Sequence, residues 1–447
     1  MEINLQTKYD PKDPNILDKI AEAYSYKIVG EVNNIEFLFC ACISKNLPRK
    51  YRLSVIIASQ SSAGKSNLVN IVLAPFKKDV IDYTDYTQAF LKRQEDLNFD
   101  GKIFKVEQME KTNEKNQVSM SSLKFLLSEG KMKVGLVERN EQGKNMPKTL
   151  EVKGIPVFIS TSTNFNIDPE TVNRTFLTQV DETEVQTKRI ISHIFKDYST
   201  LSINDSWNTE LVELEKLVEI FKRFGHQITD ILIPWGHKII DRIPIANITI
   251  RRDLSKILNL TCVLAFIHAS NRIRFQDVDG KNFIIDSFGA TENRYTYALI
   301  AQTSDFKEAL EIAGGTIKQT LNKLNESAME IYEKIKQACK EKTLENQTQQ
   351  VLDPKITEGI TVKEMAVILK KSDNRTRELM NQLWNAGFLN RERQKSKEYV
   401  YYLTEREFEQ INVDDIQFNQ DELDQWIKEQ IGTNSEKLKV LYPDDSA

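Results

Sequence analysis

The sequence is poor in the residue types that build disulfide frameworks and metal sites. Among its 447 residues there are four cysteines, Cys40, Cys42, Cys262 and Cys339, and four histidines. The cysteine spacing fits neither a disulfide framework nor paired CxxC motifs for zinc. No two histidines stand three or four residues apart, as two ligands on one helix face would. We therefore expect cysteines that act as small core residues, and no metal site made of protein ligands alone.

Long apolar runs are absent as well. No stretch approaches the roughly 18 apolar residues that a membrane-spanning helix needs, and residues 1–5 lack the basic start of a signal peptide. These absences predict a cytoplasmic protein with no membrane partner. Glycine (16) and proline (11) are scarce, and 40% hydrophobic with 28% charged residues indicates a globular, helix-rich chain. The net charge of −4 does not mark a nucleic-acid binder, although local basic faces are compatible with it.

Changes in pattern divide the chain into six segments. From residue 53 to about 200, short apolar runs alternate with helical patterns, which is typical of an α/β domain on a largely parallel sheet. Residues 341–353 are polar and mark a linker. Residues 411–447 contain nine acidic and three basic residues. The predicted segments are a helical segment (1–50, with two helices over 14–45), an α/β core (51–204), a mostly helical region with a hairpin near 278–281 (205–345), a linker (346–355), a compact unit (356–410) and an acidic amphipathic helix with a solvated tail (411–447).

The most specific pattern is a phosphate-binding loop at residues 53–67. An apolar, β-branched strand leads into a loop of small residues, and Gly64-Lys65-Ser66 begins a helix. In such a P-loop, backbone N–H groups cradle phosphate oxygens, Lys65 contacts the β and γ phosphates, and Ser66 binds Mg²⁺. Ser59 stands where the pattern has glycine, and the small residues after it still let the backbone approach phosphate. The expected cofactors are ATP and Mg²⁺, and the predicted nucleotide-binding residues are Ser61, Ser62, Ala63, Gly64, Lys65, Ser66 and Asn67.

A second apolar strand, at residues 101–108, ends in Glu107 and Gln108. A P-loop ATPase needs acidic residues here to hold Mg²⁺ and polarise the attacking water. Glu107 can serve the metal, but an amide at Gln108 cannot accept a proton. Three alternatives follow: Glu107 performs both tasks, hydrolysis is slow, or Gln108 is an engineered change that traps bound ATP. A third buried strand, at 154–164, ends in Thr161, Thr163 and Asn164.

The order of these motifs resembles the AAA+ helicases of the minichromosome maintenance group and the related helicases of mobile elements and viruses. The resemblance spans roughly residues 30–300 and depends on four runs, at 62–66, 105–108, 126–130 and 160–164. It implies a P-loop AAA+ ATPase core with a helical lid region. It further implies an ATP-driven DNA helicase in replication that assembles as a homo-oligomeric ring, expected to be a hexamer.

The resemblance also implies roles for particular residues. Asn164 would be the sensor that orients water, and Arg174 the arginine finger that reaches the γ phosphate of a neighbouring subunit. In the run 250–258, Arg252, or with less support Arg251, would face the nucleotide as sensor 2. The predicted catalytic residues are thus Lys65, Glu107, Gln108, Asn164, Arg174 and Arg252. The chain departs from the family at Ser59 and Gln108, and about 50 residues before the core are too few for a DNA-encircling domain.

Two elements are candidates for DNA contact. Residues 131–152 form two β-type runs around a polar tip, which predicts a hairpin. Its cations Arg139, Lys144 and Lys148 would track the DNA backbone in the central channel of a ring. The alternative is a solvated surface hairpin.

Residues 359–403 have the pattern of a C-terminal winged-helix domain: helix, turn, helix, then an antiparallel pair with a basic turn. Arg375 and Arg377 would face a DNA groove. Arg393, Lys395 and Lys397 would lie on the wing near phosphates. The alternative is protein binding, which winged helices also perform.

Two other functions remain open. An AAA+ ATP switch, such as a replication initiator, helicase loader or transposition regulator, would bind DNA without unwinding it, and a native Gln108 favours it. A DNA-binding adaptor with a degenerate nucleotide pocket is opposed by the intact Lys65 and Ser66.

Overall fold

The chain forms two compact units in the computed structural model, Met1–Gly314 with Asn412–Ala447, and Gly315–Ile411. The described residues are 7–83, 98–107, 123–139, 145–163, 169–199, 206–245, 250–277, 296–322, 324, 326–349, 359–393, 398–408, 411, 416–432 and 437–443. In these ranges no helix is both long and apolar enough to cross a membrane. The first unit contains the predicted phosphate-binding motif and the second contains the predicted helix-turn-helix.

Two N-terminal helices pack onto the core of the first unit. They are α1 (Ile16–Tyr24) and α2 (Val32–Ile43), in the region where two helices were expected. Nine of the twelve α2 residues are buried, because this helix lies against α3 on one side and α9 on another. Its Cys40 and Cys42 are buried free thiols, which confirms the prediction that they are core residues.

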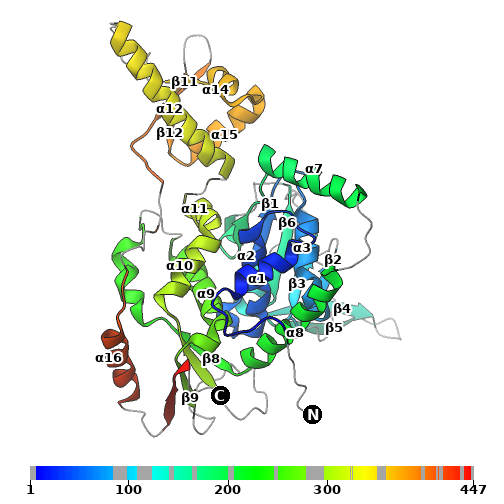
Figure 1. The fold of residues 1–447 in the computed structure, drawn as a ribbon. Helices are drawn as coiled ribbons and strands as arrows, with labels where there is room; N and C mark the ends of the chain where they lie inside the picture. The colour runs from blue at the N-terminus through cyan, green and yellow to red at the C-terminus, as the bar shows by residue number, and fades with distance from the viewer. Residues whose placement is uncertain are drawn as a thin grey trace. The chain divides into compact units, whose positions relative to one another are not determined.

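The centre of the first unit is a sheet of five strands in the order β2-β3-β6-β1-β7 (Figure 1). Every neighbouring pair in it is parallel, as predicted. Every residue of β1, β3 and β6 is buried and most are apolar, which is usual for the central strands of a covered parallel sheet. The strands are β1 (Val55–Ala58), β2 (Val80–Tyr83), β3 (Ile103–Val106), β6 (Val157–Ser162) and β7 (Phe176–Thr178).

A hairpin stands outside this sheet. It consists of β4 (Lys131–Arg139) and β5 (Asn145–Lys153), which pair antiparallel from Lys131↔Lys153 to Arg139↔Asn145. This confirms the predicted hairpin. At its base Gly154 has φ +93°, and a Cβ there would lie 2.3 Å from the backbone nitrogen of Asp100, so only glycine fits.

A second sheet differs from the sequence prediction. The region 205–345 was expected to be mostly helical, with one hairpin near 278–281 that lies outside the described residues. It contributes three strands, β8 (Ile228–Leu232), β9 (Arg274–Asp277) and β10 (Tyr297–Ile300). The expected solvated tail contributes a fourth, β14 (Leu438–Leu441), and the order is β14-β9-β10-β8. Four-residue strands have too weak a local pattern to be recognised without their partners.

The helical elements that complete the first unit connect and cover these sheets. They include a helix at 123–129 and, in chain order, α3 (Lys65–Leu73), η3 (Ala74–Asp79), α6 (Pro169–Val172), α7 (Glu184–Ser199), α8 (Ser206–Gly225), η4 (Pro234–Arg242), α9 (Ile250–Ile267), α10 (Thr303–Ile312) and α16 (Gln420–Ile431); short 3₁₀ turns are η1 (Ser44–Asn46), η2 (Arg49–Tyr51) and η5 (Ala269–Asn271).

The second unit has one core, formed by helices against a three-stranded antiparallel sheet of order β11-β13-β12. Its boundary with the first unit is at the start of α11, not at the linker predicted for 346–355. The reason is that α12 continues to Gln349 and its apolar face joins the core of this unit. The elements are α11 (Gly314–Asn322), α12 (Glu326–Gln349), β11 (Ile360–Thr361), α14 (Val362–Leu369), α15 (Asp373–Asn385), β12 (Leu389–Arg393) and β13 (Tyr399–Leu403).

A buried ion cluster ties three elements of the first unit together. Asp79, at the end of η3, lies 2.7 Å from Nζ of Lys45 in η1, 3.1 Å from Lys102 and 3.3 Å from Lys222 in α8. The Lys45 side chain is fully buried. Burial favours the neutral form of Asp79, but the lysine ammonium groups outweigh it and lower the pKa of Asp79 to about 2.

Asp79→Asn should lower the free energy of unfolding at pH 7 by about 3–5 kcal/mol, because it leaves a buried ammonium group unpaired. Since the folded pKa of Asp79 lies below the ordinary 3.8, its stabilisation is complete above that value and lost as the pH falls toward 2. The free energies of unfolding of the variant and the parent, measured by urea denaturation, should therefore differ less at pH 3 than at pH 7. The exposed Asp241→Asn is the control, and an equal loss in both variants would contradict the role of the cluster.

Candidate functional site

The predicted phosphate-binding loop lies between β1 and α3, at the carboxyl edge of the parallel sheet. Ser62 (φ +65°) and Gly64 (φ +87°) adopt left-handed backbone conformations, so the chain turns sharply before α3 begins at Lys65. No neighbouring atom lies within 4 Å of a Cβ placed on Gly64, so the glycine serves the backbone angle and not a tight approach. Ser66 and Asn67 are exposed, and the N–H groups of this first turn have no partner within the helix. This is the geometry that binds an anion at a helix start.

Ser59, the departure from the glycine pattern, has a structural explanation. It is fully buried. Its Oγ accepts a hydrogen bond from the Val180 N–H at 3.0 Å, and its own N–H donates to the Ser162 carbonyl at 3.1 Å. The residue therefore joins the loop to the last residue of β6 and to the segment that follows β7, and a glycine would lack the bond to Val180.

Lys65 is folded back onto its own loop. Its buried Nζ donates to the carbonyl oxygens of Ser59 at 2.8 Å and Gln60 at 2.5 Å. Burial lowers the pKa of Lys65, and the Glu182 carboxylate opposes that shift. Glu182, which follows β7, also accepts the Gln60 N–H at 2.6 Å. A carboxylate thus lies at the loop that the sequence assigns to phosphate, and sequence reasoning did not identify this residue.

The acidic strand ends beside the strand predicted to hold the sensor. The Thr161 hydroxyl donates to the Glu107 carbonyl, and the Ser160 hydroxyl donates to the Val106 carbonyl at 2.9 Å. β6 lies between β3 and β1, so Glu107 is two strand spacings, about 10 Å, from the P-loop strand. Exposed Ser66 and half-buried Glu107 offer the oxygen donors that Mg²⁺ prefers, and the remaining ligands would be phosphate and water.

A buried lysine next to Glu107 was also missed by sequence reasoning. Lys105 Nζ lies 2.9 Å from Asp82 and 3.5 Å from Glu107, and its side chain is 5% exposed. A charged residue inside an otherwise apolar strand is the signal that could have identified it. Gln108 and Asn164 lie outside the described residues.

Arg174 lies at the opposite edge of the sheet from Lys65. It precedes β7, whose first residue pairs with Val55 at the beginning of β1. Its Nε donates to Ser128 Oγ at 2.7 Å and its Nη1 to the Glu170 carbonyl at 2.8 Å. Because all the strands are parallel, the P-loop follows β1 at the carboxyl edge while Arg174 stands at the amino edge. The structure therefore does not bring these two residues together within one chain.

The first turn of α9, which contains Arg251 and Arg252, lies against the same amino edge. Partly buried Lys256 donates to the carbonyls of Val172 at 3.3 Å and Thr175 at 3.1 Å, on either side of Arg174. Arg251 and Arg252 are exposed, and Arg252 stands one turn before Lys256. Both arginine segments thus belong to one edge, away from the predicted phosphate-binding loop of their own chain.

The candidate DNA-contacting residues occupy two places. In the hairpin, Arg139 pairs with Asn145 at the distal end and Lys148 pairs with Leu136, while Lys144 is outside the described residues. In the second unit, Arg375 forms an ion pair with Glu378 at 2.8 Å.

The remaining candidates of the second unit lie on α15 and the β12–β13 pair. Arg377 is exposed on α15, and Arg393 ends β12 opposite Tyr399. Lys395 and Lys397 are outside the described residues. Arg391, not predicted, stacks on Trp384 with its guanidinium 3.5 Å from the ring centre.

Comparisons with known proteins give distant likenesses only. No family model matches the chain, and no curated protein matches it. Among solved structures, a full-length MCM homolog from Methanopyrus kandleri is 12% identical with a TM-score of 0.40, and the likeness covers 69% of this chain and 60% of that one. The JCV helicase, solved with a bound thiazolopyridine compound, is 14% identical with a TM-score of 0.25, over 56% of this chain and 64% of that one. The chain thus spans less than two thirds of either structure, and at these scores neither likeness bears on activity.

Glu182→Gln should tighten binding of Mg·ATP about fivefold. In a high dielectric, a carboxylate a few ångströms from a phosphate oxygen repels it by about 1 kcal/mol, and the neutral amide removes this repulsion. Titration with a non-hydrolysable ATP analogue would measure the change, and raised salt should diminish it. Glu184→Gln, in the first turn of α7, is the matched control. Equal affinities of both variants and the parent would show that the carboxylate does not compete with phosphate.

Proposed function

We propose that this chain is an AAA+ ATPase that couples ATP hydrolysis to translocation on DNA, as a ring-forming helicase in replication. The observation that supports this best is the separation of Lys65 from Arg174 across one parallel sheet. A site that holds its phosphate loop at one edge and its arginines at the other can be completed only by a second copy. Such a head-to-tail contact between unlike surfaces closes into a ring or extends as a filament, and we propose a closed hexamer.

Each hydrolysis site would use residues from two adjacent subunits. In one subunit, the N–H groups at the start of α3 and Lys65 bind the phosphates, while Ser66 and Glu107 hold Mg²⁺. Asn164, with Glu107 or Gln108, orients the attacking water. Arg174 and Arg252 of the adjacent subunit stabilise the charge that spreads over the transferred phosphoryl group.

An uncovered apolar surface supports assembly. Among the described residues of α7 only Gln186 is buried. Phe195 is 70% and Tyr198 90% exposed. Such a surface marks a contact with another molecule. α7 begins two residues after Glu182, at the edge where a neighbour's arginines must approach, so we assign a second copy to it. We call this surface the apolar stripe of α7; its members recur at helical spacing and are Ile190, Ile191, Ile194, Phe195 and Tyr198.

DNA is the proposed track of the motor. The nine-residue strands β4 and β5 form a two-stranded sheet of their own, with Arg139 and Lys148 in its distal half. We propose that these two cations, together with Lys144, contact the DNA. A ring of such hairpins would offer sequence-independent contacts to a DNA backbone. We further propose that 356–410 is a winged-helix DNA-binding domain, supported by the order α14, α15, β12, β13 and the three-stranded sheet.

One sequence feature favours a second candidate function. With Gln108 where a second acid is usual, ATP could persist after binding and drive assembly on DNA without unwinding, as in an initiator or loader. The two functions differ in turnover and in strand separation.

The purified chain should hydrolyse ATP, single-stranded DNA should stimulate it, and a forked duplex should be unwound. Lys65→Ala should abolish turnover, and Arg174→Ala should lower it about 10³-fold or more. An equal mixture of the two inactive chains should regain activity, because about a quarter of the sites then combine an intact Lys65 with a neighbour's intact Arg174. Phosphate release and strand displacement are the measurements.

Gln108→Glu is the comparison that separates the two functions. If neither form turns over while ATP still drives assembly on DNA, the switch function replaces the motor. If the mixture stays inactive although each chain binds ATP, the shared site is wrong.

Phe195→Asp should weaken oligomerisation and lower ATP turnover by at least about tenfold, because it places a charge in an apolar contact. Sedimentation with ATP would measure the assembly, and single-chain ATP affinity should remain unchanged. Lys188→Asp reverses a charge on the same helix outside the apolar stripe. If Phe195→Asp leaves the assembly intact, or if both variants dissociate it equally, the apolar stripe of α7 is no interface.

A further inference from the structure

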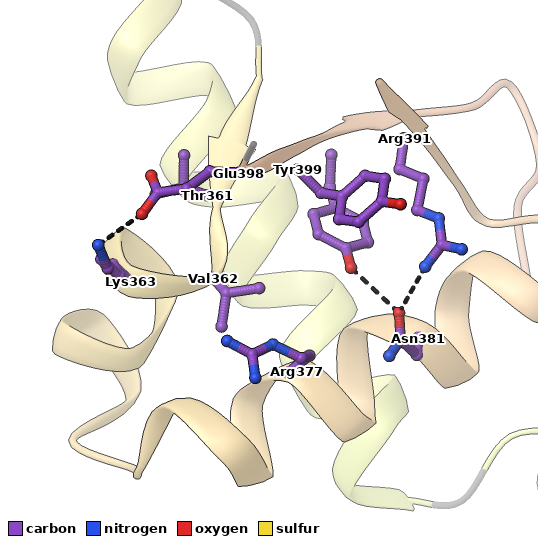
Figure 2. A pocket seen from close by; sticks show the side chains of 9 residues that line it. Thr361, Val362, Lys363, Arg377, Asn381, Arg391, Glu398 and Tyr399 are labelled. Carbon is purple, nitrogen blue, oxygen red and sulfur yellow. Dashed lines mark hydrogen bonds and ion pairs between the residues drawn. The ribbon is translucent and has the colours of Figure 1, made fainter. Parts of the chain in front are cut away.

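A pocket of about 320 Å³ opens in the second unit (Figure 2). Its walls come from β11 with the start of α14, from the outer face of α15, and from the facing strands β12 and β13. Its size lies at the lower end of the range of about 300–1,000 Å³ usual for small-molecule sites. It is therefore too small to enclose a helix, but large enough for one nucleotide.

The polar groups of the pocket are mostly donors. Asn381 Oδ1 accepts bonds from Arg391 Nη1 at 3.0 Å and from the Tyr401 hydroxyl at 3.1 Å, so the oxygen of this amide is already paired and its nitrogen is the remaining polar group. Arg377, one turn earlier on α15, lines the same wall, and within the described part of the chain it has no ion pair or hydrogen bond. Figure 2 shows its guanidinium group below Val362.

The charge of the pocket favours an anion. Three cations, Lys363, Arg377 and Arg391, line it together with one carboxylate, Glu398. Lys363 and Glu398 form an ion pair with each other. Arg391 and Arg377 are therefore left with positive charge, and the ligand should bring phosphate or other acceptor oxygens.

An aromatic face completes the site. The Arg391 guanidinium lies 3.5 Å from the Trp384 ring centre and 4.7 Å from that of Tyr399, so it is held between two rings. Tyr399 is 40% exposed and lines the pocket. A ring fixed by a cation on one side is a platform on which a planar base can stack, a contact open to every base type.

We propose that this pocket binds one unpaired nucleotide of single-stranded DNA, with its base on Tyr399 and its phosphate on Arg377. The inference rests on the proposed DNA-binding function, and it assigns the second unit to single strands instead of the major groove of a duplex. In a duplex the base faces are stacked and cannot reach Tyr399, whereas an unpaired base can turn into the pocket. The Asn381 amide would donate to a base carbonyl or a phosphate oxygen.

The test uses the full chain without ATP and three probes: a thymidine oligomer, a blunt hairpin duplex and thymidine monophosphate. Arg377→Ala and Tyr399→Ala should each weaken binding of the oligomer by about tenfold, the scale of one stacked base. Duplex binding should be unchanged. Tyr399→Phe, which keeps the ring, should bind the oligomer as the parent does. Lys334→Ala removes an exposed cation from α12 outside the pocket and is the control for charge alone.

A second measurement locates the contact. An oligomer with 5-iodo-deoxyuridine should photo-cross-link to Tyr399, as mapped by mass spectrometry. Cross-links confined to the hairpin 131–153 would overturn the pocket and leave the proposed motor intact. Failure of the chain to bind any DNA would overturn both. Displacement of the oligomer from Tyr399 by equimolar thymidine monophosphate would show that the pocket is a site for free nucleotides. If Arg377→Ala and Tyr399→Ala weaken binding of duplex and single strand equally, the pocket belongs to a duplex-binding surface.

Discussion

The five central strands all run in the same direction, and this one constraint determines where the polar loops of the core can lie. Every loop that follows a strand is at the carboxyl edge, where ligands of open α/β sheets bind. The P-loop, Glu107 and Glu182 are there. Every segment that precedes a strand is at the amino edge, where Arg174 and the first turn of α9 lie. The sheet thereby separates the phosphate loop from the arginines, and the proposed oligomer follows from that separation.

The carboxyl edge is held together by hydrogen bonds between strand ends. Ser59 connects the loop to the end of β6 and to the segment after β7, and Ser160 and Thr161 connect β6 to the end of β3. These bonds explain why a serine can replace the usual glycine. The buried hydroxyl has a hydrogen-bond partner, so its burial leaves no polar group unsatisfied. The loop itself is closed in this structure, with Lys65 on its own carbonyls and Glu182 on a backbone amide. Phosphate binding would therefore exchange internal partners for ligand oxygens.

Some cations of the second unit are held by neighbouring side chains instead of forming an open basic surface. Arg375 is paired with Glu378 and Arg391 is stacked between two rings, so two cations of the predicted helix-turn-helix are held by their neighbours. What it presents is a donor-lined pocket beside an aromatic face. This is a reason to consider single strands, since unstacked bases need an aromatic platform more than a dense row of cations.

The sequence by itself determined the features that depend on near neighbours. The turn at Gly64, the start of α3 and the β4–β5 hairpin were predictable, because left-handed turns, helix starts and hairpins are set by a few consecutive residues. The parallel core followed from strands that alternate with helices. The tertiary structure alone decided the pairing of 438–441 with 274–277, the ion pair of Lys105 with Asp82, the approach of Glu182 to Gln60 and the edge on which Arg252 lies. Each of these joins residues distant in sequence, and a short strand or a single charge has no local pattern that selects its partner. Only the packing of the whole unit supplies the free energy that closes such long loops.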